Sequence, residues 1–259
     1  MAGFDPSWLA LREPYDHAVR DRDLTRDFVD ALGPSPELID LGSGTGSNLR
    51  FLAPHLPPTQ RWTCVDHDPR LLACLAETRP AGIAVASRTL DLARELGELS
   101  IRPGVGITAA ALLDLTSAAW LDALIERCRD MPMLMTLSFD GRMVWDPVDP
   151  SDEAVNAAFN RHQCSDKGFG PALGPDAASY LAERLRGDDR DVRVAPSDWV
   201  FGADDGSILQ AMVDGIAAAA GEIDPTLPLE AWRARRCGEI DEKRLALTVG
   251  HLDVLALPK

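Results

Sequence analysis

Residues 38–48 read LIDLGSGTGSN, an apolar run that contains the acid Asp40 and is followed by glycines at alternate positions, Gly42, Gly44 and Gly46. Because glycine lacks a Cβ, it lets the backbone turn sharply, adopt positive φ values and approach a ligand closely. The segment therefore predicts a strand, a tight turn and the start of a helix that together bind a nucleoside. A dinucleotide fingerprint would need G-x-G-x-x-G, and Ser47 stands at its third glycine position.

The flanking sequence agrees with this interpretation. Prolines precede a strand expected at residues 37–41, and residues 47–53 can begin a helix. A second β-rich segment, residues 61–66, ends in Asp66, whose carboxylate can accept hydrogen bonds from both hydroxyls of a ribose. Asp68 followed by Pro69 is a better helix start than Asp66, which leaves Asp66 free for a ligand.

The acid and the three glycines of residues 40–46 resemble motif I of the class I S-adenosylmethionine-dependent methyltransferases. The resemblance implies that Asp40, Gly42, Gly44 and Gly46 help to bind S-adenosylmethionine, and that Asp66 holds its ribose. His67 would lie against the adenine or be solvated.

Two later segments fit the same family pattern. Residues 82–86 predict a third strand, and in the loop after it Asp91 and Leu92 would hold the adenine, although Asp91 can also cap a helix at residues 92–99. Residues 106–117 predict a fourth strand and its loop, so Asp114 and Leu115 would border the site of methyl transfer.

The whole series implies an α/β fold, a three-layer Rossmann-like sheet of seven strands, mostly parallel with the last strand antiparallel. Residues 131–139 predict the fifth strand, after which Gly141 indicates a tight turn and residues 142–145 a short returning strand. Residues 191–194 and 244–257 predict the sixth and seventh strands.

Two regions flank the expected cofactor site. Residues 1–33 are expected to form an N-terminal helical lid, and residues 34–259 a methyltransferase domain. On a continuous helix Arg12, Asp16 and Arg20 would share one face, from which they could reach the amino and carboxylate groups of the methionine part of the cofactor. Pro14 interrupts this pattern, and a surface ladder of ion pairs explains it equally well.

Residues 140–180 are expected to form an insertion that covers the substrate, because much of this region is polar, aromatic and punctuated by glycine. Asn160, His162, Gln163 and Lys167 are the candidate substrate contacts. His162 is also the candidate general base for an acceptor that must lose a proton. His251, the other available imidazole, lies in the terminal strand, where a histidine is more often part of the core.

Composition limits the classes of partner. The net charge of −15 disfavours nucleic acid, and the apolar stretches are too short to span a membrane. Five scattered cysteines without a C-x-x-C pair favour reduced thiols and no metal site, and the first residues do not resemble a secretion signal. We therefore expect a cytoplasmic protein with a small-molecule partner. Phe4, Trp8 and Leu9 suit either a homodimer contact or a lid.

The leading hypothesis from the sequence is an S-adenosylmethionine-dependent methyltransferase that acts on a small-molecule acceptor by in-line methyl transfer. One alternative is an NAD(P)-dependent oxidoreductase of a related Rossmann fold, against which Ser47 argues. Another is a non-catalytic binding protein that keeps the methyltransferase fold.

Overall fold

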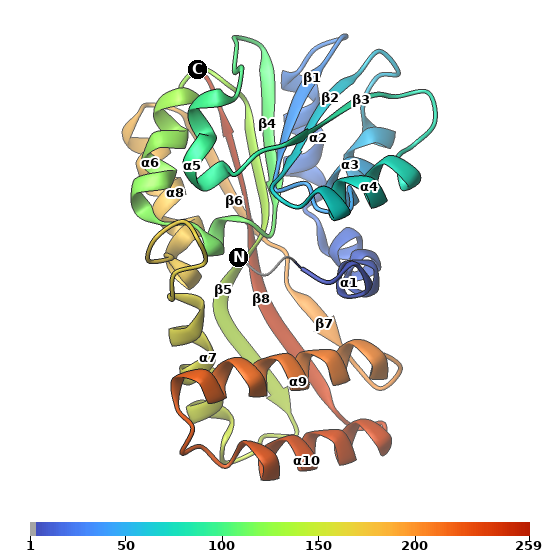
Figure 1. The fold of residues 1–259 in the computed structure, drawn as a ribbon, viewed down its shortest axis with the longest axis vertical. Coiled ribbons are helices and arrows are strands. Elements are labelled where there is room, and N and C mark those ends of the chain that lie inside the picture. Colours follow the sequence, from blue (N-terminus) through green and yellow to red (C-terminus); the bar gives the residue numbers. More distant parts are fainter. Residues whose placement is uncertain (1–3) are drawn as a thin grey trace.

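The structure is a computed structural model that describes residues 4–259, so residues 1–3 of the expected lid lie outside the described residues. Within that range eight strands form one sheet, and helices cover both of its faces (Figure 1). The strands are β1 (Glu37–Leu41), β2 (Arg61–Asp66), β3 (Ala84–Thr89), β4 (Val105–Ala110), β5 (Met133–Asp146), β6 (Asp191–Pro196), β7 (Trp199–Phe201) and β8 (Ala246–Leu257).

The α-helices alternate with the strands along most of the chain, as expected for an α/β fold. They are α1 (Pro6–Val19), α2 (Arg22–Ala31), α3 (Ser47–Leu52), α4 (Pro69–Thr78), α5 (Leu92–Glu95), α6 (Ala118–Arg127), α7 (Asp152–Gln163), α8 (Ala177–Gly187), α9 (Gly206–Ile223) and α10 (Leu229–Asp241). Across residues 4–259 we find no helix with the length and apolar character that crossing a bilayer requires.

The strand order is β3-β2-β1-β4-β5-β8-β6, and the short β7 also pairs with β8. Neighbours among β1 to β5 are parallel, whereas β8 runs antiparallel to β5, β6 and β7. The predicted Rossmann-like fold class, with its antiparallel last strand, is confirmed. The sheet has eight strands instead of seven because Trp199–Phe201 adds a strand of only three residues, which is too short to give a clear pattern in the sequence.

Alternate side chains of the sheet form two apolar layers. Leu38 and Leu255 join the layer that α2, α3 and α4 cover, whereas Ile39 and Val254 join the layer beneath α6 and α8. Because helices cover both faces, the central strands are buried along most of their length. The flanking helices therefore leave the carboxyl ends of the strands as the place for a ligand.

The strands β5 and β8 extend beyond the parallel part of the sheet, and α7, α9 and α10 pack around this extension (Figure 1). Met143, Trp145, Trp199 and Phe201 are buried on its covered face, whereas Val144 and Val200, which alternate with them along the strands, are exposed. Such alternation is typical of antiparallel strands with one covered face. The extension thus provides a second apolar surface, separate from the two layers of the main sheet.

The tight turn predicted at Gly141 is wrong, because β5 continues through it to Asp146. Gly141 has φ of 88°, and the pairing of β5 with β8 shifts register between Phe139 and Met143. The glycine therefore allows a bulge in a continuous strand. The strand that pairs with residues 143–146 is β8, about a hundred residues later in the chain, so the local sequence could not reveal it.

Candidate functional site

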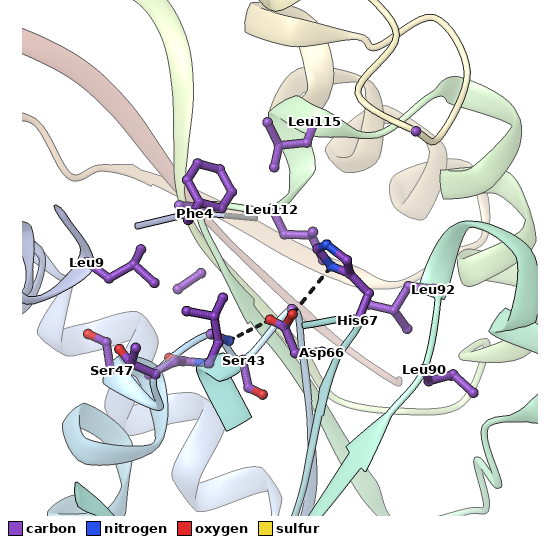
Figure 2. A pocket seen from close by; sticks show the side chains of 18 of the residues that line it. Phe4, Leu9, Ser43, Ser47, Asp66, His67, Leu90, Leu92, Leu112 and Leu115 are labelled. Carbon is purple, nitrogen blue, oxygen red and sulfur yellow. Dashed lines mark hydrogen bonds and ion pairs between the residues drawn. The ribbon is translucent and has the colours of Figure 1, made fainter. Parts of the chain in front are cut away.

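A cavity of about 260 Å³, here called the first cavity, lies at the carboxyl ends of β1, β2, β3 and β4 (Figure 2). The chain adds β2 and β3 on one side of β1 and then places β4 on the other, so the strand order reverses between β1 and β4. In open α/β sheets, ligands bind in the crevice at such a reversal. The position of the first cavity alone therefore makes it the candidate site.

The turn after β1 forms one wall of the first cavity. Gly42, Gly44 and Gly46 have φ values of 64°, 52° and 88°, in the left-handed region that favours glycine. A Cβ on Gly46 would lie 2.8 Å from Cγ of Leu75 in α4. Gly46 does not itself line the cavity, so its contribution is to let α3 begin close against α4.

Asp66 lines the first cavity at the end of β2 and is only 6% exposed. Its Oδ2 accepts a hydrogen bond from the amide of Gly44 at 2.8 Å, and its Oδ1 accepts one from the amide of Asp68 at 2.9 Å. Each carboxylate oxygen has two lone pairs, so Asp66 can accept two further donors. The neighbouring His67 also lines the cavity, with Nδ1 3.4 Å from Oδ1 of Asp66 (Figure 2).

Asp40 is fully buried beneath the glycine turn and does not line the first cavity. It accepts a hydrogen bond from Nδ2 of Asn48 at 2.7 Å, and Asn48 also contacts Thr108 and Arg20, each at 3.0 Å. Burial raises the pKa of Asp40 to about 7, although the hydrogen bond from Asn48 acts to lower it. Because Asn48 lines the cavity, Asp40 would affect a ligand by orienting Asn48.

The loop after β3 supplies another wall. Asp91 accepts a hydrogen bond from the amide of Ala93 at 3.0 Å and so begins α5, and both Asp91 and Leu92 line the first cavity. The two roles that the sequence left open for Asp91, a helix cap and a group beside a ligand, are therefore geometrically compatible. Leu90 and Leu92 give this side an apolar surface, across the cavity from Leu9 (Figure 2).

The loop after β4 completes the wall next to β5. Leu112 and Leu115 line the first cavity, whereas Asp114 between them does not. Oδ1 of Asp114 is buried and accepts no hydrogen bond within residues 4–259. Burial raises the pKa of Asp114 to about 6, while the charges of Arg12 and Lys167 act in the opposite direction. The carboxyl of Asp114 lies outside the lining of the first cavity, between two residues that belong to it.

The helix α1 closes one side of the first cavity and continues through Pro14. Arg12 and Asp16 both line the cavity, with Nε of Arg12 2.9 Å from Oδ2 of Asp16. Trp199 donates a hydrogen bond from Nε1 to Asp16 at 3.1 Å, and its ring lies 4.9 Å from the guanidinium carbon of Arg12. Since Asp16 and Arg20 are buried, the alternative of a surface ion-pair ladder is wrong.

The four candidate substrate contacts lie on α7 or just after it, outside the first cavity. Asn160 donates to a backbone carbonyl of β5 at 3.0 Å. His162, the candidate general base, has its ring nitrogens 3.2 Å from Nζ of Lys167 and from a carboxylate oxygen of Glu222. The structure brings none of these four residues to the first cavity.

A second cavity, of about 410 Å³, lies between the extension of β5, β7 and β8 and the helices α1, α7 and α9. Its lining is mostly aromatic and aliphatic, and its polar side chains are Gln163 and His251. Phe4 lines both cavities, so the two adjoin at the start of α1.

Several residues that line the first cavity were not singled out by the sequence. They are Ser43, Thr45, Ser47, Asn48, Leu71, Leu90, Arg94, Ala110, Ala111, Leu112, Gly168 and Phe169. Phe4 and Leu9, for which the sequence left open a lid or a homodimer contact, line this cavity as well. The apolar contacts from residues 110–112 and 168–169 had no signal in the sequence, because they depend on how the loops pack.

Comparisons with known proteins identify the fold. No family model and no curated protein sequence matches the chain. A cyclopropane-fatty-acyl-phospholipid synthase-like protein from Lactobacillus casei has a similar structure, with 13% identity and a TM-score of 0.52 over 93% of this chain and 98% of that one. The cyclopropane synthase MmaA2 from Mycobacterium tuberculosis is similar with 11% identity and a TM-score of 0.51, over 96% of this chain and 94% of that one. The YcgJ protein from Bacillus subtilis is similar with 9% identity and a TM-score of 0.51, over 92% of this chain and 99% of that one.

Proposed function

We propose that this chain, which has the Rossmann-like fold of the class I methyltransferases, binds S-adenosylmethionine in the first cavity and transfers its methyl group to a small molecule. One observation carries the proposal. The first cavity lies where the strand order reverses, between the glycine turn after β1 and the carboxylate of Asp66 at the end of β2. A nucleoside with two ribose hydroxyls fits that combination of a close backbone approach and a carboxylate.

The residues around the first cavity suit the nucleoside half of this cofactor. We assign the ribose hydroxyls to Asp66, whose oxygens have lone pairs left after accepting the amides of Gly44 and Asp68. The adenine is assigned to the side lined by His67, Asp91 and Leu92. Apolar contact from Leu90 and Leu92 favours a flat aromatic base there.

The opposite side of the cavity suits the methionine half. An amino acid has one positive and one negative group, and Arg12 and Asp16 offer the two complementary charges on one helix face. We therefore assign the carboxylate to Arg12 and the amino group to Asp16. Gly42 and Gly44 also line the cavity, so the backbone there can approach the ligand closely.

When bound, S-adenosylmethionine supplies a methyl group activated by its positively charged sulfur. A lone pair of the acceptor forms a bond to the methyl carbon while the carbon–sulfur bond breaks and its electron pair goes to sulfur. An acceptor that carries a proton on the attacking atom would release that proton to water. Leu112 and Leu115 border this step in our assignment, with the carboxyl of Asp114 between them in the chain, and the protein contributes mainly by holding the reactants in line.

The domain boundaries follow the same assignment. Residues 1–33 are proposed as the lid, since α1 contributes Leu9, Arg12 and Asp16 to the first cavity. Residues 34–259 would form the methyltransferase domain. Within residues 140–180, Gly168 and Phe169 line the first cavity, which supports a role for that segment in covering the reactants.

Calorimetric titration of the purified protein with S-adenosylmethionine, S-adenosylhomocysteine and NAD tests the proposal. We expect saturable binding of both sulfur compounds and none of NAD. The variant Asp66→Ala should bind S-adenosylhomocysteine roughly 10 to 100 times more weakly, because hydrogen bonds to a charged group contribute about 1.5–3 kcal/mol.

The matched control is Asp68→Ala, which removes the cap of α4 two residues away without removing a group from the first cavity. Its affinity should stay within about threefold of the wild-type value. The proposal fails if the folded wild-type protein binds neither sulfur compound, or if it binds NAD alone.

A further inference from the structure

The second cavity has a lining that excludes charged ligands. Its walls come mainly from Phe139 and Met143 of β5, Phe159 of α7, Trp199 of β7, and Met212 and Ile216 of α9. Within the described residues no Asp, Glu, Lys or Arg side chain lines it. Moving an ion from water to such a surface is strongly unfavourable, whereas aromatic and aliphatic walls favour an apolar ring.

His251 is the one titratable side chain that lines the second cavity, and it is 5% exposed. Its Nδ1 lies 3.1 Å from the backbone oxygen of Val249. Because a carbonyl oxygen only accepts hydrogen bonds, Nδ1 must carry the hydrogen, and Nε2 is left with a free lone pair. No hydrogen-bond donor to this Nε2 is present among residues 4–259.

The surroundings of His251 keep its ring neutral. Burial, together with the charges of Arg12 and Arg142, lowers the pKa of His251 to about 3, although the hydrogen bond to Val249 and the carboxylate of Asp198 act to raise it. The ring therefore acts as a hydrogen-bond acceptor across the physiological pH range. It selects a ligand that donates a hydrogen bond, because a ligand without a donor leaves the buried acceptor unpaired.

The second cavity adjoins the first at two places. Phe4 lines both cavities. Trp199, which lines the second cavity, contacts Arg12 and Asp16, which line the first. A molecule in the second cavity would thus lie next to the proposed position of the methionine part of the cofactor.

Building on the proposed function, we infer that the second cavity is the acceptor site, and that its ligand is a neutral, apolar, ring-containing molecule that donates one hydrogen bond from a hydroxyl or N–H group to Nε2 of His251. His251 then binds and orients the acceptor. His162, the candidate general base from the sequence, lines neither cavity, whereas His251 lines this one.

Equilibrium dialysis with a matched pair of probes, 2-naphthol and 2-methylnaphthalene, tests the inference without any cofactor. The probes have nearly the same shape, but only 2-naphthol donates a hydrogen bond. Wild-type protein should bind 2-naphthol about ten times more tightly, and the anion 2-naphthoate should bind most weakly. In His251→Phe the preference for 2-naphthol should disappear, while binding of 2-methylnaphthalene stays within about threefold.

A second variant keeps the test decisive if His251→Phe does not fold. Gly215 in α9 lines the second cavity, and a Cβ there would meet no atom within 4 Å, so the side chain introduced by Gly215→Leu should narrow the cavity. Both neutral probes should then bind at least about ten times more weakly. Gly238→Leu in α10 is the matched control, because Gly238 is also helical and unobstructed but lines neither cavity.

The inference is overturned if wild-type protein binds the two neutral probes equally, if the preference survives in His251→Phe, or if Gly215→Leu behaves like Gly238→Leu. It is also overturned if S-adenosylhomocysteine competes with 2-naphthol, since the two would then share one cavity. Titrating each variant with S-adenosylhomocysteine separates the two proposals. If the wild-type protein does not bind S-adenosylhomocysteine, the cofactor assignment is refuted. The binding of the naphthalene probes tests the assignment of the second cavity independently of that result.

Discussion

Asp40 illustrates how a buried carboxyl can influence a site that it does not line. It holds Asn48, and Asn48 lines the first cavity. Its pKa is raised mainly by burial, Asp66 raises it further, and Asn48 and Arg20 act to lower it. The proton that Asp40 retains in the folded protein makes the stability of the fold depend on pH.

We expect the wild-type protein to lose stability relative to Asp40→Asn as the pH rises. A carboxyl with a raised pKa stabilises the fold below its unfolded pKa, near 4, and loses that contribution as the pH passes about 7. Between pH 4.5 and 7.5 the free energy of unfolding of the wild type should therefore fall by roughly 2–4 kcal/mol relative to Asp40→Asn, measured by urea denaturation.

Asp68→Asn is the control for this measurement. The side chain of Arg70 lowers the pKa of Asp68 to about 2, so the contribution of Asp68 is lost only in stronger acid. The difference between wild type and Asp68→Asn should stay constant from pH 4.5 to 7.5. Parallel pH profiles for the wild type and Asp40→Asn would show that Asp40 has no raised pKa.

The helix α1 contains a proline that local rules would place at a break. Pro14 cannot donate a backbone hydrogen bond and its ring crowds the preceding turn, yet the helix continues to Val19. Contacts on both sides hold it in place, including Glu13 with Arg50 and the hydroxyl of Tyr15 with Asp205 at 2.8 Å. Tertiary contacts of α1 thus outweigh a local preference that sequence analysis weighs heavily.

Pro14→Ala should stabilise the protein by about 1–3 kcal/mol, because Pro14 is exposed and alanine restores both the missing donor and a good helix propensity. Urea denaturation gives the free energy of unfolding. Ala10→Gly, at another exposed position of α1, should lower it by about 1 kcal/mol and shows whether α1 unfolds with the rest of the protein. A destabilising Ala10→Gly beside a neutral Pro14→Ala would contradict the prediction.

A buried ion pair links two of the helices around the extension of β5 and β8, α7 and α10. Arg236 of α10 is fully buried and lies 4.9 Å from the ring of Trp145. It pairs with Asp152 of α7 and, at 2.7 Å, with Glu239. Since α7 and β5 also line the second cavity, this ion cluster supports the walls of the proposed acceptor site.

Arg236→Ala should destabilise the whole protein by about 3–5 kcal/mol, because it leaves two buried carboxylates without their partner. The control is Arg184→Ala, which breaks an exposed ion pair with Asp122 and should change the free energy of unfolding by less than about 1 kcal/mol. Thermal and urea denaturation of both variants measure the difference. If both variants lost the same free energy of unfolding, burial would not determine how much each ion pair contributes to stability, and the prediction would be wrong.

The amino-acid sequence was sufficient to predict the features that depend on a few adjacent residues. These include the glycine turn at residues 42–46, the acid at the end of β2, and the helix starts at Asp68 and Asp91. Each follows from backbone conformation or from a short hydrogen bond between neighbours, and their regular succession also predicted the Rossmann-like sheet.

Contacts between residues that are distant in the chain could be identified only in the folded structure. Phe4, Trp199 and His251 come from opposite ends of the chain, yet all line the second cavity, and β8 pairs with β5 where the sequence predicted a hairpin at Gly141. Asp40 belongs to the predicted motif, but its packing places it behind the site. Such placements result from the packing of side chains across the whole molecule, which no local pattern of residues encodes.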